Sequence, residues 1–185
     1  MYKTHEKMEK IFNIAGPCIE NEHYMLPATD RIAEISSLIN QKQYFVIHAA
    51  RQSGKTTLLQ HLADDINARG KYYALYCSLE SVQPFIDPEK GIPSILANIK
   101  RAVKYSLLPE KEAFGKDVSN NISVMVNEAL SDMCASSNKP VVMLFDEVDS
   151  LSNGTLITFL RQLRDGYVNR GRIPFVHSLA LVGMR

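Results

Sequence analysis

The chain has 185 residues, of which 45% are hydrophobic, and this is enough to bury the core of one domain. Its 21 basic and 20 acidic residues give a formal net charge of +1, which excludes a global electrostatic field that would recruit nucleic acid or a membrane. No apolar run approaches the length of a bilayer span, and the polar first ten residues lack the core of a signal peptide. The three cysteines have no close spacing, so we expect a reducing, cytoplasmic environment.

A helix and a strand are the first elements that the sequence predicts. Thr29 or Asp30 can cap a helix whose apolar residues recur at helical spacing. These apolar residues are Ile32, Ile35, Leu38 and Ile39. The apolar stretch 44–49 then predicts the first strand.

A glycine-lysine-threonine turn follows this strand. Residues 49–56 fit the Walker A pattern G-x-x-x-x-G-K-[ST] except at the first position, where Ala49 replaces glycine. Backbone N–H groups at the N-terminus of a helix point at a polyanion, and the helix dipole adds to the attraction. The residues that we expect to hold the phosphates and their metal are Ala50, Arg51, Gln52, Ser53, Gly54, Lys55, Thr56 and Thr57.

Three residues of this loop have distinct predicted roles. Gly54 leaves room for phosphates that a Cβ would crowd. Lys55 would bridge the β- and γ-phosphates as a mobile charge, and the Thr56 hydroxyl would ligate magnesium. The alternative is a chance Gly-Lys-Thr sequence in a turn, and a second motif downstream argues against it.

Between the two motifs the sequence predicts three helices and one strand. Apolar residues from 58 to 66 form one helix, and Gly70 fits its left-handed C-cap. Residues 72–77 are rich in strand formers, and residues 79–91, with two prolines, predict a loop. Further helices are expected from Pro93 onward and over about 118–136.

The second motif is an apolar strand that ends in carboxylates, over residues 141–149. Its apolar run fits a strand buried on both faces of a parallel sheet, as in a Walker B motif. Because an unpaired ionised carboxylate is costly to bury, we expect Asp146 and Glu147 at the exposed C-terminal tip of that strand. Ligands bind at this edge of open α/β sheets, so the two motifs can meet at one phosphate.

Each carboxylate then has a predicted role. Asp146 would hold magnesium, most simply through a water, because this cation keeps much of its hydration shell. Glu147 would orient or deprotonate the attacking water. The alternative is a solvated turn that begins a helix. Asp149 is secondary, since the residues after it favour a turn.

The last predicted elements are a helix ending near Gly166 and an apolar strand over 175–184. Arg185 would extend from the tip of that strand and contact the γ-phosphate; the alternative is a frayed terminal residue. The alternation of elements predicts a three-layer α/β/α sandwich around a mainly parallel sheet. No helix follows the last strand, so we expect a fold truncated after it, with a lead-in over 1–28 and a core over 29–185.

These motifs together resemble the bacterial AAA-like ATPase domain family. This group belongs to the additional-strand, catalytic-glutamate class of P-loop NTPases and is related to archaeal-type and STAND-like ATPases. The resemblance is carried by residues 12–18, 23–27, 50–57, 144–149, 159–164 and 179–185. It implies that the arginine-tipped strand lies between the other two motif strands, with Arg185 as the first sensor. It also implies that a further strand and a helical lid follow, and that Tyr24 and Met25 pack on the adenine.

The resulting hypothesis is magnesium-dependent binding and hydrolysis of ATP that drives a conformational switch. Lys55, Glu147 and Arg185 would be its catalytic residues. Two alternatives remain: a nucleotide-gated interaction module with little turnover, and a small-molecule kinase. Expected partners are ATP and ADP, with a second copy or another protein through the missing C-terminal region. Arginines near the last strand could serve a neighbouring subunit or simply form a solvated face. No membrane contact is expected, and this segment does not indicate nucleic-acid binding because its basic residues lack an aromatic platform.

Overall fold

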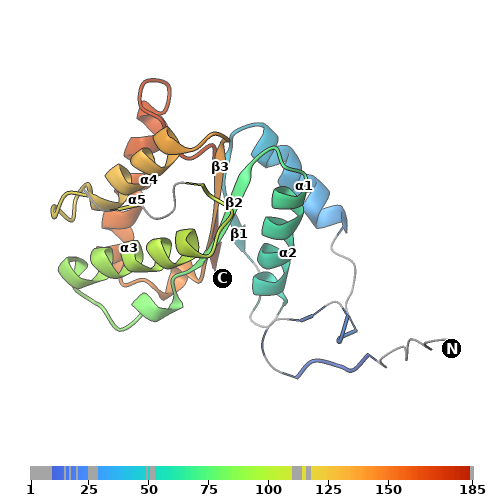
Figure 1. The fold of residues 1–185 in the computed structure, drawn as a ribbon. Coiled ribbons are helices and arrows are strands. Elements are labelled where there is room, and N and C mark those ends of the chain that lie inside the picture. The colour runs from blue at the N-terminus through green and yellow to red at the C-terminus, as the bar shows by residue number, and fades with distance from the viewer. Residues whose placement is uncertain are drawn as a thin grey trace, which may run out of the picture.

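Strands and helices alternate along the chain in a computed structural model (Figure 1). The structure describes residues 10–14, 16, 18–19, 21–24, 29–48, 50, 53–109, 114–115 and 118–183. The helices are α1 (Thr29–Asn40), α2 (Lys55–Ala68), α3 (Pro88–Lys104), α4 (Met125–Ser136) and α5 (Asn153–Asn169). The strands are β1 (Tyr44–His48), β2 (Tyr73–Ser78), β3 (Val141–Asp146) and β4 (Ser178–Gly183). Two short 3-10 helices, η1 (Glu80–Val82) and η2 (Val148–Ser150), follow β2 and β3.

The strands form one parallel sheet in the order β1-β4-β3-β2. Strand β4 therefore lies between the strands that precede the two motifs, as the family resemblance implied. Since all four strands run in the same direction, their carboxyl ends lie at one edge of the sheet. The loop after β1 and the acidic residues after β3 consequently share that edge, with the end of β4 between them.

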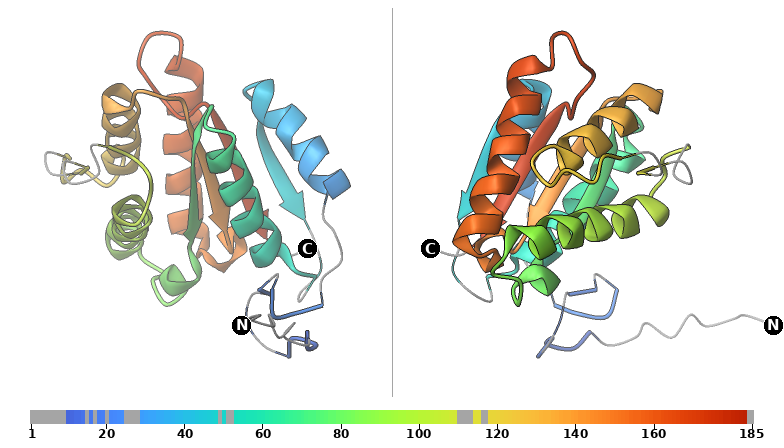
Figure 2. Two further views of the ribbon diagram at one scale, coloured as in Figure 1. Left: turned by 45° about the vertical axis from the view of Figure 1, so that its right-hand side comes forward. Right: turned by 90° about the vertical axis from the view of Figure 1, so that its left-hand side faces the viewer.

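Helices cover both faces of the sheet, which confirms the predicted α/β fold in three layers (Figure 2). Helices α1 and α2 pack on one face, around buried residues such as Ile39, Leu62 and Leu144. Helices α3, α4 and α5 pack on the other, where the rings of Phe145 and Phe159 meet edge to face at 5.2 Å. All six residues of β3 are buried, which explains the unbroken apolar sequence of the five that precede Asp146.

The start of α3 differs from its prediction. The helix begins at Pro88, and Pro93, expected at its start, lies inside it. Asp87 caps the N-terminus, since its Oδ1 accepts a hydrogen bond of 3.0 Å from Glu89 N. Proline is well tolerated at the first helical position because the N–H that it lacks has no partner there. The predicted loop over 79–91 is confirmed at 79 and over 83–87 and was wrong elsewhere, because the segment also contains η1 and the first turn of α3.

Helix α4 begins at Met125, well after the predicted start near residue 118. Its first turn is capped from another helix, because Gln162 Oε1 accepts from Val126 N at 2.8 Å and from Asn127 N at 3.2 Å. The Gln162 amide nitrogen also donates to Ile122 O at 2.9 Å. This buried side chain of α5 therefore decides where α4 begins.

Helix α5 continues through Gly166 to Asn169, although its end was predicted near this glycine. Gly166 is required by packing, because a Cβ at this position would lie 2.2 Å from Phe175 Cζ. The predicted last strand was also too long, since Phe175 and Val176 precede β4 in the chain. Both are buried in the core on the face of the sheet that α3, α4 and α5 cover, and they do not extend the strand.

We expect Gly166→Ala to lower the free energy of unfolding by about 1–2 kcal/mol. Overpacking against Phe175 costs about 1–3 kcal/mol, and the better helix propensity of alanine offsets up to about 1 kcal/mol of it. Urea denaturation measures the change. Gly171→Ala is the matched control, because no atom lies within 4 Å of its added Cβ. Equal stability of the two variants would contradict the packing role of Gly166.

Candidate functional site

The loop after β1 leads directly into α2. Gly54 is the N-cap of the helix and has φ +78°, a left-handed conformation that favours glycine. A residue with a Cβ would be strained at position 54, so the backbone conformation favours glycine here. Lys55 is buried, and its Nζ donates a hydrogen bond of 3.1 Å to Ala50 O, across the loop. Ala49, Arg51 and Gln52 lie outside the described residues.

The two sequence motifs are in direct contact. Thr56, in the first turn of α2, donates its hydroxyl to Asp146 Oδ2 at 2.7 Å, although 90 positions separate the two residues in the chain. Asp146 is the last residue of β3. The parallel sheet and the helix that follows β1 therefore bring together the side chains that the sequence predicted as neighbours.

Asp146 is buried, with 1% of its surface exposed, and the expectation of an exposed position at the strand tip was wrong. The carboxylate is buried because it is well hydrogen-bonded. In addition to Thr56, the hydroxyl of Tyr76 donates to Oδ2 at 3.1 Å, and the backbone N–H of Glu147 donates to Oδ1 at 3.0 Å. Three donors compensate for lost hydration and make burial of the carboxylate feasible.

Tyr76 is a site residue that sequence reasoning missed. It belongs to β2, which is rich in strand formers and carries neither motif. Its position near the carboxyl end of the strand was the available signal, but the sequence does not say that β2 lies beside β3. The hydroxyl of Tyr76 has a raised pKa, first because of burial and then because of the neighbouring Asp146 carboxylate. The hydroxyl therefore keeps its proton at neutral pH and donates a hydrogen bond to Asp146.

Glu147 has an unusual backbone and an unusual electrostatic setting. Its φ of 56° and ψ of 40° place it in the left-handed region, which is costly for a residue with a Cβ. Partial burial, followed by the charges of Asp146 and Asp149, raises the pKa of Glu147, whereas Lys55 acts in the opposite direction. The carboxylate is therefore a stronger base than an ordinary glutamate and is held by a strained turn.

Asp149 lies against the end of β4. A Cβ on Gly183 would lie 2.7 Å from Asp149 Oδ1, so the last residue of β4 must be glycine for η2 to pack there. The predicted sensor, Arg185, follows two positions later and lies outside the described residues. The acidic turn after β3 is thus packed between the ends of neighbouring strands.

Part of the N-terminal lead-in reaches the same region. Cys18 N donates a hydrogen bond of 3.1 Å to Thr57 Oγ1, in the first turn of α2. The rings of Phe12 and Tyr24 are in contact with a centroid distance of 5.0 Å, and Tyr24 is 53% exposed. Met25, expected with Tyr24 at the adenine, lies outside the described residues.

The oxygen atoms of Thr56 and Asp146 fit magnesium, which prefers hard oxygen ligands. Among the residues that the structure describes, no group of three or more histidine, cysteine, aspartate or glutamate side chains could form a protein-only metal cage. Magnesium takes only one or two carboxylates from a protein and completes its shell with water and phosphate. The donor set at this sheet edge is therefore suited to a metal that arrives with a phosphate ligand.

A comparison with protein families gives a match to the family described as "AAA domain" over residues 39–184, which is most of the chain. The chain belongs to this AAA domain family. Its fold and its motif placement are those of a P-loop ATPase domain, and membership implies that the AAA domain binds a nucleotide.

Solved structures similar to this AAA domain include the Aeropyrum pernix ORC1 protein in complex with DNA. The TM-score is 0.52 and the identity 13%, over 87% of this chain and 40% of that chain. Another is a DNA replication initiation factor, with a TM-score of 0.45 and 17% identity over 89% of this chain and 40% of that chain. The match spans less than half the length of either protein, and at 13% identity the likeness to the ORC1 protein concerns the fold alone.

A search of curated proteins gives no match to this AAA domain. No helix in the described part of the AAA domain has both the length and the apolar character that are needed to cross a bilayer.

Glu147→Gln should stabilise this AAA domain at neutral pH and have little effect in acid. A carboxyl whose pKa is raised by folding destabilises the native state once it is ionised, and this cost vanishes as the pH falls below its unfolded pKa. The neutral amide mimics the protonated acid. Urea unfolding at about pH 7 and about pH 4 should therefore show a gain in unfolding free energy only at the higher pH.

Glu34→Gln, on the exposed part of α1, controls for the loss of one surface carboxylate. A gain for Glu147→Gln that is the same at both pH values would argue against the electrostatic strain described above.

Proposed function

We propose that this AAA domain binds ATP with magnesium and hydrolyses it by attack of water on the γ-phosphate. The observation that carries this proposal is the hydrogen bond of 2.7 Å between Thr56 and Asp146, which joins the phosphate loop to the acidic strand. A phosphate and a metal bound at the loop would thereby lie next to the acidic turn after β3.

The loop after β1 would bind the phosphates. The first backbone N–H groups of a helix have no acceptor within the helix and lie at the positive end of its dipole, so those at the start of α2 are suited to donate to phosphate oxygens. Lys55 Nζ would exchange its bond to Ala50 O for phosphate oxygens, which accept stronger, charge-assisted hydrogen bonds. Since Lys55 is already buried in the loop, little side-chain freedom is lost in this exchange. By position in the motif, Arg51, Gln52 and Ser53 would contribute backbone donors.

Thr56 and Asp146 would hold the metal. Magnesium at this place supplies positive charge that neutralises the developing charge on the phosphoryl oxygens. The Thr56 hydroxyl oxygen would be a ligand while the hydroxyl keeps donating its hydrogen bond to Asp146 Oδ2, and the carboxylate would accept from water in the metal shell. The buried carboxylate would then gain a cation to balance its charge.

Glu147 would be the general base. It follows Asp146 directly, and its left-handed backbone turns the chain sharply at the end of β3. A raised pKa makes a carboxylate a more effective proton acceptor near neutral pH. Arg185, two positions beyond the end of β4, would contact the γ-phosphate as the sensor that the family resemblance implies.

A role for a binding partner is also part of the proposal. A neighbouring subunit or another protein would use the state of the nucleotide, because a ligand shifts an equilibrium only if it binds the two states differently. Arg161 and Arg164 are exposed on α5 and are available to such a partner, whereas Arg170 stacks on Tyr167 at 3.9 Å. The likeness to a protein solved with DNA covers 40% of that chain and does not assign DNA binding to this domain.

We expect Lys55→Ala to weaken ATP binding by about 100-fold or more. The variant leaves the charge of the bound phosphate without the lysine, and loss of one partner from a buried charge pair costs about 2–5 kcal/mol. Glu147→Gln should retain binding and lose about 10²- to 10⁴-fold in turnover, the usual contribution of a general base. Isothermal titration with ATP and magnesium measures binding, and phosphate release measures turnover. Lys71→Ala is the matched control, because Lys71 lies beyond the C-terminal end of α2, away from the phosphate loop, and donates a hydrogen bond to Asn40 of α1.

Each alternative has its own outcome. ATP binding by Lys55→Ala that equals the wild type would show that the site assignment is wrong. Tight binding by the wild type without phosphate release indicates a nucleotide-gated interaction module. Phosphate transfer that requires an added hydroxyl acceptor indicates a kinase.

A further inference from the structure

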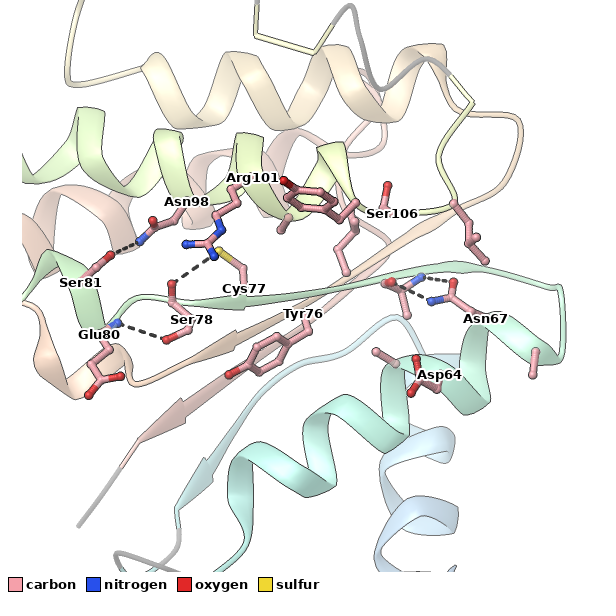
Figure 3. A pocket seen from close by; sticks show the side chains of 17 residues that line it. Asp64, Asn67, Tyr76, Cys77, Ser78, Glu80, Ser81, Asn98, Arg101 and Ser106 are labelled. Carbon is pink, nitrogen blue, oxygen red and sulfur yellow. Dashed lines mark hydrogen bonds between the residues drawn. The ribbon is translucent and has the colours of Figure 1, made fainter. Parts of the chain in front are cut away.

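Tyr76 links the edge strand β2 to the acidic end of β3. It carries neither sequence motif, yet its hydroxyl lies 3.1 Å from Asp146 Oδ2. Figure 3 shows its ring on the side of β2 that faces α2. Tyr76 also lines a groove of about 790 Å³ between α2 and α3, which does not include the phosphate loop. The side chain thus has its ring beside a groove and its hydroxyl at the candidate metal site.

The hydrogen bonds around Asp146 are distributed unequally between its two oxygens. Oδ2 accepts from both the Thr56 and the Tyr76 hydroxyls, whereas Oδ1 accepts from Glu147 N. An ionised carboxylate offers about four lone-pair positions, two on each oxygen. The two hydroxyls therefore fill Oδ2, and one acceptor position is left on Oδ1. Tyr76 is the donor that makes the two oxygens different.

The strand that carries Tyr76 is fixed to α2. Asn67, on α2, donates from Nδ2 to Ala74 O at 2.9 Å and accepts from Ala74 N at 3.0 Å, as a neighbouring strand would (Figure 3). The same helix carries Thr56 in its first turn. Helix α2 and strand β2 are thus joined at two points, by Asn67 and through the shared carboxylate of Asp146. The Tyr76 hydroxyl is consequently held in position from both sides.

We propose that Tyr76 is a positioning residue for magnesium. Its hydroxyl, together with that of Thr56, holds the Asp146 carboxylate in one orientation and leaves Oδ1 to accept from a water in the metal shell. This inference rests on the proposed function, since it concerns the same site. It adds a contribution from the edge strand that neither sequence motif contains.

The test separates magnesium from the nucleotide. ATP affinity is measured by isothermal titration with saturating magnesium and again with a chelator. The magnesium ratio is the dissociation constant in chelator divided by the dissociation constant in magnesium, and it expresses how much the metal strengthens ATP binding. Tyr76→Phe should lower that ratio by about 10-fold, the lower end of the usual loss on removing a partner that orients a metal ligand. Its ATP affinity in chelator should equal that of the wild type, because the phosphate loop is untouched.

Tyr73→Phe is the matched control. Tyr73 is in the same strand, and its hydroxyl donates to Asn138 Oδ1 at 3.1 Å, far along β2 from the site. Its magnesium ratio should equal that of the wild type. Phenylalanine keeps every ring contact of tyrosine, so both variants should fold. Tyr76→Phe should melt at a lower temperature than the wild type, because it takes one donor from the buried Asp146 carboxylate, whereas Tyr73→Phe loses only an exposed hydrogen bond and should melt as the wild type does.

A double-mutant cycle identifies the path of the effect. If Tyr76 acts through the carboxylate, adding Tyr76→Phe to Asp146→Asn should change the magnesium ratio no further. A further 10-fold loss in that background, or a ratio in Tyr76→Phe equal to that of the wild type, would overturn the positioning role.

The failure of this inference differs from the failure of the proposed function. A wild-type protein that binds ATP with magnesium, together with an unaffected Tyr76→Phe, leaves the proposed function intact and removes the role of Tyr76. If the wild-type protein binds ATP equally with and without magnesium, both the metal-binding role of Thr56 and Asp146 and the positioning role of Tyr76 are wrong. A wild-type protein that does not bind ATP removes the proposed function and this inference with it.

Discussion

Burial of one carboxylate organises the edge of the sheet. Asp146 ends the central strand β3 with 1% of its surface exposed, and a charge in that position is tolerated only if its oxygens are hydrogen-bonded. The donors come from the first turn of α2, from β2 and from the backbone after β3. Hydrogen bonding of the Asp146 carboxylate therefore requires the start of α2 and the edge strand β2 to meet at the end of β3. The candidate site is a consequence of that requirement.

The same requirement concentrates negative charge. Asp146, Glu147 and Asp149 lie within four residues. Partial burial raises the pKa of Glu147 most, the charges of the two aspartates raise it further, and Lys55 lowers it. Such a cluster is costly in the protein alone and becomes favourable when a cation binds beside it. The left-handed backbone of Glu147 adds strain at the same turn. Electrostatics and backbone strain thus both point to this turn as the place where the protein gives up stability for function.

The family match and the fold agree on the type of domain, and the sequence motifs agree with both. The agreement is strongest where the chemistry is local. A phosphate loop needs a glycine with a positive φ directly before a helix, and Gly54 and Lys55 are adjacent in the chain. The continuous apolar run of residues 141–145 likewise predicts the buried strand β3. By contrast, the start of α4 depends on Gln162, which lies 36 residues downstream of the N–H group that it caps. Likewise, Gly166 does not end α5 but leaves room for the ring of Phe175, which no local pattern indicates.

The sequence alone thus determined the alternation of helices and strands, the two motifs, and the proximity of Lys55, Thr56, Asp146 and Glu147 in the candidate site. These features depend on residue order over a few positions, where backbone sterics and hydrophobic periodicity act. The tertiary structure decided that Asp146 is buried, that Tyr76 donates to it, that α4 begins at Met125 and that α5 continues through Gly166. Those outcomes depend on hydrogen bonds and packing between distant elements. Their free energy exists only after the sheet has brought those elements together, and no local pattern in the sequence encodes it.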